Sequence, residues 1–197
     1  MQIISGSLKG RNIKTTKKQD ENKDLRPTTD YAKQVLFNLL NNNPIVNTEI
    51  EGAKVMDAFA GTGAVGFEFF SRGANHITFV DSDLLNIKQL KAISAELGVS
   101  AIVVSKFLPS TDIKEKFNII FADPSYSEGK GKVAQVIKNF LELNLEEDGI
   151  IILETINRKS ELEELKKHLE KKDVLKNLIH ERGASKGYFM FFKLTNQ

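Results

Sequence analysis

The sequence predicts an α/β protein in which a mixed seven-stranded sheet carries helices on both faces. Three observations predict it: strand-like and helix-like segments alternate from residue 54, two strand-like segments end the chain without a helix between them, and a glycine-rich turn follows the first strand. Alternating strands and helices are typical of a parallel sheet covered on both faces. The last two strands lack a crossover helix, so they are expected to pair antiparallel.

Each element has a local signal. Capping side chains at Thr28-Thr29-Asp30 follow Pro27, and apolar residues then recur at helical spacing up to an Asn-Asn-Asn-Pro stop at 41–44. Short apolar runs predict strands over 54–59, 76–81, 101–104, 117–122 and 149–154. Helices are predicted over 64–72, 84–97, 133–143 and 160–171, the last capped by Ser160. Two β-rich segments, 174–181 and 187–194, close the sheet.

The composition is that of a globular protein with basic ends and an acidic centre. The chain has 197 residues, of which 41% are apolar and 27% charged. Residues 1–26 hold seven basic and three acidic side chains, residues 27–154 eleven and seventeen, and residues 155–197 ten and six. Basic ends suit a phosphate-rich partner and an acidic centre suits a cationic ligand, although ordinary solvated faces would give the same pattern. We expect an N-terminal extension over 1–44 and a main domain over 45–197.

Several classes of protein are excluded or disfavoured. The chain has no cysteine, so it has no disulfide or thiolate metal site, and its three scattered histidines give no reason to expect a metal. No apolar run approaches the ~20 residues that cross a bilayer, and the N-terminus lacks a signal-peptide stretch. A cytoplasmic monomer without membrane contact is therefore expected.

The strongest motif is the turn Asp57-Ala-Phe-Ala-Gly61-Thr-Gly63-Ala-Val-Gly66, with G-x-G-x-x-G spacing between a strand and a helix. Asp81, twenty residues after Gly61, ends the next strand, where a carboxylate can take both hydroxyls of a ribose. NAD enzymes and S-adenosylmethionine (SAM) enzymes share this arrangement. Asp57 suits the cationic α-amino group of SAM better than a pyrophosphate. The terminal hairpin likewise favours the class I SAM-dependent methyltransferase architecture. The expected cofactor-binding residues are Asp57, Phe59, Gly61, Gly63, Asp81, Ser82 and Asp123.

A second motif, Asp123-Pro124-Ser125-Tyr126, follows the fourth strand, where open α/β sheets bind ligands. An exocyclic base amine is a poor nucleophile because its lone pair is delocalised into the ring. Asp123 can accept one amine N–H and the Pro124 carbonyl the other, which frees the lone pair for attack on the sulfonium methyl. Tyr126 can stack on a flipped base. We therefore expect Asp123, Pro124 and Tyr126 to be catalytic.

With these motifs in place, the sequence resembles the RsmD family of 16S rRNA (guanine-N2) methyltransferases over nearly its whole length. The resemblance rests on the segments 3–11, 25–30, 35–38, 57–66 and 123–126, with Asp81. It implies SAM as methyl donor and one guanine of 16S rRNA as acceptor, with the 30S subunit or its assembly intermediate as partner. Arg26, Thr28 and Tyr126 are expected to bind substrate, and Arg26 and Thr28 to fold over the cofactor cleft.

Three departures from the family pattern stand out. The family loop normally reads Asp-Pro-Pro before its aromatic residue, and Ser125 replaces the second proline. Lys33 and Gln34 stand where relatives usually carry Arg and Glu, which questions a salt bridge on that helix. Ser105-Lys106-Phe107 offers no carboxylate near an adenine; Phe107 either stacks there or belongs to the core, and the core is slightly favoured.

Other functions remain open at this stage. An adenine-N6 nucleic-acid methyltransferase would use the same loop chemistry, an NAD-dependent oxidoreductase could use the same glycine turn, and Ser125 would suit a non-catalytic, methyltransferase-like RNA-binding module. Nucleoside analysis after incubation with SAM and hypomethylated 30S subunits separates the two methyltransferases, and ligand-induced stabilisation separates SAM from NADH.

Overall fold

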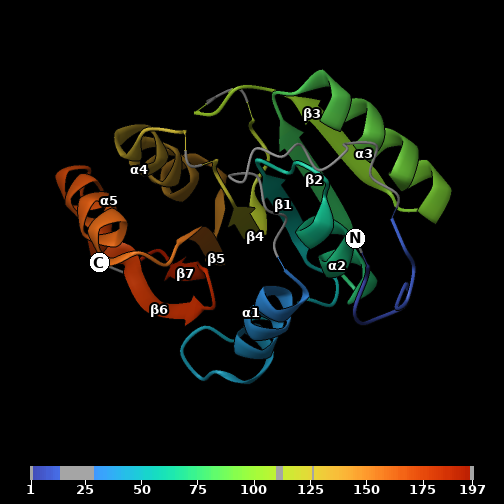
Figure 1. Ribbon diagram of the computed structural model, residues 1–197, viewed down its shortest axis with the longest axis horizontal. Coiled ribbons are helices and arrows are strands. Elements are labelled where there is room, and N and C mark those ends of the chain that lie inside the picture. The colour runs from blue at the N-terminus through green and yellow to red at the C-terminus, as the bar shows by residue number, and fades with distance from the viewer. Residues whose placement is uncertain (1, 14–28, 110–112, 126, 196–197) are drawn as a thin grey trace.

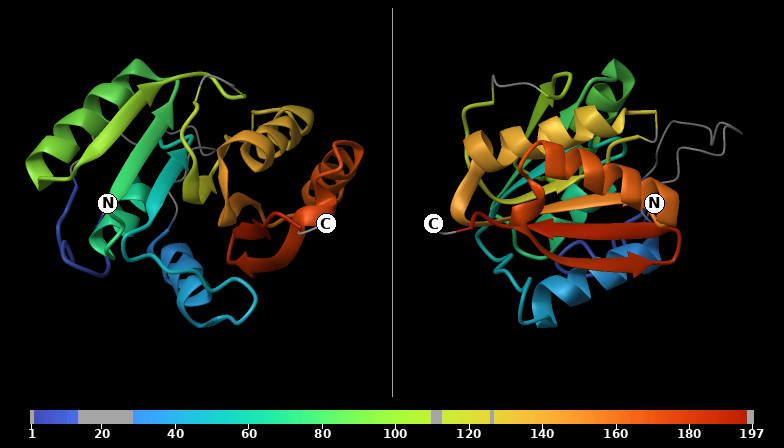
Figure 2. Two further views of the ribbon diagram at one scale, coloured as in Figure 1. Left: turned by 180° about the vertical axis from the view of Figure 1, so that it is seen from behind. Right: turned by 90° about the vertical axis from the view of Figure 1, so that its left-hand side faces the viewer.

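A seven-stranded sheet of order β3-β2-β1-β4-β5-β7-β6 forms the centre of the computed structural model (Figure 1), which describes residues 2–13, 29–109, 113–125 and 127–195. The first five strands are parallel, β7 runs antiparallel to β5, and β6 pairs antiparallel with β7. Figure 2 shows this terminal hairpin at the edge of the sheet. The strands are β1 (Lys54–Ala58), β2 (His76–Asp81), β3 (Ala101–Ser105), β4 (Phe117–Ala122), β5 (Leu145–Ile156), β6 (Leu178–Ala184) and β7 (Gly187–Phe192). The predicted mixed sheet with its antiparallel hairpin is confirmed.

The helices also follow the predicted order. They are α1 (Asp30–Asn42), α2 (Ala64–Ser71), α3 (Leu84–Leu97), α4 (Lys130–Asn139) and α5 (Lys159–Lys171), with a π turn at Phe140–Asn144 and a 3-10 turn at Leu175–Asn177. The predicted Ser160 cap is wrong: Ser160 lies inside α5, and Arg158 occupies the cap position without a side-chain cap bond. No helix among the described residues is long and apolar enough to span a bilayer.

Two apolar cores cover the two faces of the sheet. Side chains of α1, α2 and α3 pack on one face, and those of α4 and α5 on the other (Figure 1). Adjacent β1 residues divide between the cores, Val55 joining the first and Met56 the second. Ile3 and Ile13 belong to the same core as Val55, so the N-terminal residues pack directly on the sheet domain. The proposed boundary between residues 44 and 45 stays a prediction.

The N-terminal arm, residues 2–13, is held against α2 by one buried carboxylate. Glu68 is fully buried and accepts hydrogen bonds from the backbone N–H groups of Ile4 (2.9 Å) and Ser5 (3.0 Å). Arg72 Nε donates to the same carboxylate at 3.0 Å, and its guanidinium lies 4.1 Å from the centre of the Phe37 ring. Because these donors satisfy the charge of Glu68, it can be buried.

Lys33 connects the arm to α1. Its side chain is 1% exposed, and its Nζ donates to the Gln2 carbonyl at 2.6 Å. The same Nζ lies 3.0 Å from an Asp30 oxygen and 3.7 Å from a Glu68 oxygen. The doubt raised by lysine at this position is therefore resolved, since Lys33 makes ion pairs on α1 and across to α2.

We expect Glu68→Gln to lower the free energy of unfolding by ~3–5 kcal/mol, because it leaves the buried charge of Lys33 without its carboxylate partner on α2. Urea denaturation with an unchanged slope measures the loss. Glu163→Gln, at a side chain that is 61% exposed on α5, is the matched control and should change stability by less than ~0.5 kcal/mol. Equal losses in the two variants would contradict the role given to Glu68.

Candidate active site

A tight turn leads from the carboxyl end of β1 into α2. Its backbone takes left-handed conformations at Phe59 (φ 62°), Gly61 (φ 54°) and Gly63 (φ 74°). This region of φ is uncommon for a bulky residue such as Phe59, so the turn holds a strained position at the sheet edge where ligands bind.

The three glycines of the motif have different environments. A side chain at Gly61 would meet only the Phe59 carbonyl at 3.9 Å, so the space beside Gly61 is open to a ligand. A Cβ at Gly63 would lie 2.6 Å from the Leu90 side chain, and one at Gly66 would lie 2.4 Å from the Phe79 ring. Gly61 thus allows close approach of a ligand, whereas Gly63 and Gly66 allow the turn and α2 to pack on their neighbours.

Asp57 is buried beneath this turn. Its side chain is on the α2 face, and Oδ2 accepts a hydrogen bond from the Gly66 N–H at 2.9 Å. Since the cap residue Gly63 supplies no side-chain bond, Asp57 satisfies a first-turn N–H of α2. Burial raises the pKa of Asp57 from 3.8 to about 8, against the Gly66 hydrogen bond, which lowers it, while the charge of Asp81 raises it further.

Asp81 fixes the turn from the neighbouring strand. Its Oδ2 accepts from Gly61 N–H (2.7 Å) and from Asn86 Nδ2 (3.1 Å), and its Oδ1 accepts from Asp83 N–H (2.8 Å). A carboxylate has about four acceptor positions, so these three bonds leave about one, on Oδ1. The contact of Asp81 with the ribose hydroxyls stays a prediction. Ser82, the next residue, is exposed.

Asp123 and Pro124 follow β4 at the same edge. The Asp123 N–H donates to the Ala58 carbonyl of β1 at 3.4 Å, so the loop starts beside the strand that leads into the glycine turn. Asp123 is half-buried and Pro124 buried, whereas Ser125 is exposed and its hydroxyl lies 2.8 Å from that of Ser127. Burial, and then the charges of Glu154 and Asp57, raise the pKa of Asp123 well above its usual range.

Glu154, a residue that the sequence motifs did not single out, completes an acidic group at this edge. It lies near the carboxyl end of β5, is 8% exposed, and contributes a charge that acts on Asp123. No local pattern marks Glu154, because its position depends on the pairing of β5 with β4.

The remaining expected site residues have mixed outcomes. Arg26, Thr28 and Tyr126 lie outside the described residues, so their roles stay predictions. Phe107 is 76% exposed two residues after β3, so the slightly favoured core placement is wrong. In the described ranges, no group of three or more His, Cys, Asp or Glu is placed to hold a metal ion.

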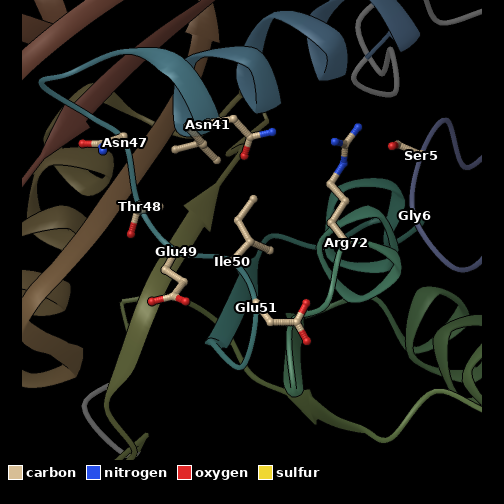
Figure 3. A pocket seen from close by; sticks show the side chains of 10 residues that line it. Ser5, Gly6, Asn41, Asn47, Thr48, Glu49, Ile50, Glu51 and Arg72 are labelled. Atoms are coloured by element: carbon tan, nitrogen blue, oxygen red, sulfur yellow. The ribbon is translucent and has the colours of Figure 1, made fainter.

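A hollow of about 740 Å³ lies at the other end of the sheet, beside the amino end of β1 (Figure 3). Glu51, one of its lining residues, shortly precedes β1, whereas the glycine turn follows β1. The other lining residues come from the arm, the end of α1, the segment before β1 and Arg72. This hollow is therefore separate from Asp57, Asp81 and Asp123.

The raised pKa of Asp57 predicts a pH effect on stability. Its folded-state pKa of about 8 exceeds the ordinary 3.8, so the folded protein holds an extra proton between these values and loses stability as the pH rises through that window. The amide of Asp57→Asn does not titrate, so this variant lacks the pH-dependent loss of stability. We expect its stability relative to wild type to improve by roughly 3 kcal/mol from pH 5 to pH 8, as measured by urea denaturation. Asp148→Asn, at an exposed residue of β5, should show no such trend.

Known proteins resemble this chain over most of its length. The family model described as conserved hypothetical protein 95 matches residues 1–178. YlbH of Bacillus subtilis is 36% identical over 161 residues, which cover 78% of this chain and 82% of that protein. The ribosomal RNA small subunit methyltransferase D of Escherichia coli strain K12 is 32% identical, with coverage of 79% and 74%.

A solved structure agrees with these sequence matches. The match to the structure of the “Putative methyltransferase yhhF” from Escherichia coli covers 100% of this chain and 99% of that protein, with a TM-score of 0.75 and 27% identity. The seven-stranded sheet and its terminal hairpin are thus those of a methyltransferase fold. The chain belongs to the family described as conserved hypothetical protein 95 and is an RsmD-like methyltransferase.

Proposed function

We propose that this protein transfers a methyl group from SAM to the exocyclic N2 of one guanine in 16S rRNA, with the 30S subunit or its assembly intermediate as substrate. The observation that carries the proposal is the position of Asp123. The Asp123 N–H donates a hydrogen bond to the Ala58 carbonyl at 3.4 Å, which places the acidic Asp-Pro loop beside the strand that leads into the glycine turn. The similarity to the ribosomal RNA small subunit methyltransferase D of Escherichia coli supports rRNA of the small subunit as substrate.

The residues around the glycine turn suit an adenosyl ligand with a cationic tail. The open space beside Gly61 lets the ligand lie close to the protein backbone, and the remaining acceptor position of Asp81 accepts a hydrogen bond from a ribose hydroxyl. Asp57 offers negative charge to an α-amino group, which would favour its ionised form. SAM, when bound, supplies a methyl group on a positively charged sulfur.

Exposed apolar side chains extend the same site along the sheet edge. Leu84 and Leu85 begin α3 shortly after β2, with 66% and 65% exposure, and Phe107 follows the adjacent β3 with 76%. Exposed apolar side chains that follow two adjacent strands offer a surface that suits the flat ring of adenine. We assign Phe107 to the adenine side of the ligand.

The Asp123 loop handles the base. The Asp123 carboxylate and the Pro124 carbonyl each accept a hydrogen bond from one N–H group of the amine. These hydrogen bonds localise the nitrogen lone pair for attack on the methyl carbon. Proline fixes φ, which removes one of the two backbone rotations that orient the Pro124 carbonyl. The attack forms an N–C bond and breaks the S–C bond, whose electron pair stays on sulfur. Tyr126 is proposed to stack on the base, and Arg26 and Thr28 to contact substrate.

We expect Asp123→Ala to reduce methyl transfer to hypomethylated 30S subunits by about a hundredfold or more, because the amine loses its acceptor. Labelled methyl transfer measures the rate, and mass spectrometry of nucleosides identifies the product. Asp148→Ala, at the exposed residue of β5, is the control and should be fully active.

The products separate this proposal from its alternatives. Formation of N2-methylguanine supports the proposed guanine methyltransferase, whereas formation of N6-methyladenine would identify an adenine methyltransferase instead. RNA binding without methyl transfer by the wild type would indicate a non-catalytic module.

We expect Phe107→Ala to weaken SAM binding about tenfold, since a stacked base contributes ~1–3 kcal/mol. Isothermal calorimetry measures the dissociation constant. Ile102→Ala removes another exposed apolar side chain from the same region, on β3 itself, and should leave SAM affinity unchanged. An equal effect of the two substitutions would remove Phe107 from the site.

A further inference from the structure

Glu154 and Asp123 occupy neighbouring positions on one face of the sheet. β4 and β5 are parallel, and their last registered pair is Ala122 with Leu153, so the next residues are Asp123, directly after β4, and Glu154, on β5. The residues before them on the same face, Phe121 and Ile152, both belong to the core under α1 and α2. Side chains at such positions of adjacent strands lie about 5 Å apart.

The terminal hairpin leaves room for the Glu154 carboxylate. Glu154 pairs with Phe189 of β7, and a Cβ at Gly187, two residues before it, would lie only 2.8 Å from Glu154 Oε1. The absence of a side chain at Gly187 therefore allows Glu154 to keep this position, close to Asp123 and largely shielded from water.

The charges that act on Asp123 are acidic. Glu154 contributes from β5 and Asp57 from β1, and with burial they raise the pKa of Asp123. On the helices that cover this face, the buried Lys33 and Glu68 are both paired, Lys33 with Asp30 at 3.0 Å and Glu68 with Arg72 at 3.0 Å, and they lie 3.7 Å from each other. On β7, Gly187 has no side chain. A carboxylate next to a like charge in a poorly solvated site binds a proton more tightly.

We propose that Glu154 is a positioning residue for methyl transfer, whose negative charge makes Asp123 a stronger acceptor for the proton that leaves the amine. The inference rests on the proposed function. When the methyl group has joined the nitrogen, one N–H bond breaks and an O–H bond forms on Asp123. The electron pair of the N–H bond remains on the nitrogen, which restores a neutral methylated amine. The proton then leaves Asp123 for water.

The pH dependence of methyl transfer tests this role. Wild-type activity should rise with pH as Asp123 loses its proton. Glu154→Gln should move this rise to lower pH by about one unit and lower the plateau rate, because Asp123 becomes a weaker base. Glu154→Asp keeps the charge and should keep the wild-type profile. Glu146→Gln, at the other end of β5, is the matched control and should match wild type.

A second measurement needs neither SAM nor RNA. The carboxyl signals of the protein labelled with ¹³C-aspartate are titrated by NMR, and the Asp123 signal is assigned as the one that Asp123→Ala removes. It should titrate at lower pH in Glu154→Gln than in wild type. Should Glu154→Gln fail to fold, Gly187→Ala, which displaces Glu154, is titrated instead and should shift Asp123 in the same direction.

The outcomes separate the two proposals. An active wild type whose pH profile and Asp123 titration are unchanged by Glu154→Gln would overturn the inference and leave the proposed function standing. A wild type that transfers no methyl group would overturn the proposed function and with it the proton step.

Discussion

The buried hydrogen bond between Asp57 and the Gly66 N–H sets the geometry on which the carboxyl edge of the sheet depends. It joins the last buried residues of β1 to the first turn of α2, whose cap residue is a glycine without a side chain to offer. With both ends of the turn fixed, Gly61 reaches the Asp81 carboxylate of β2. One carboxylate below the turn and another beside it therefore define the open space above Gly61.

Much of the fold could be predicted from the sequence, because its signals are local. Strand-length apolar runs alternate with helical spacing, and the glycine motif lies where a strand meets a helix. The Ser160 cap failed for a local reason as well: Lys159 already has helical structure, so α5 starts before the serine.

The site was only partly predictable, because several of its properties depend on contacts between distant segments. Glu154 comes next to Asp123 through strand pairing, which no motif records. The acceptor capacity of Asp81 depends on Asn86 and Asp83, which take positions that a nucleotide would otherwise use. The exposure of Phe107 depends on how the chain leaves β3, and an apolar residue after a strand is more often buried.

The docking of the N-terminal arm on α2 also constrains how the chain acquires its fold. The backbone groups of Ile4, Ser5 and Leu8 form hydrogen bonds with the side chains of Glu68 and Ser71, which follow 63 to 66 residues later. During synthesis residues 4–8 emerge long before residues 68–71. They can dock only after α2 has formed, so the arm becomes ordered later than that helix.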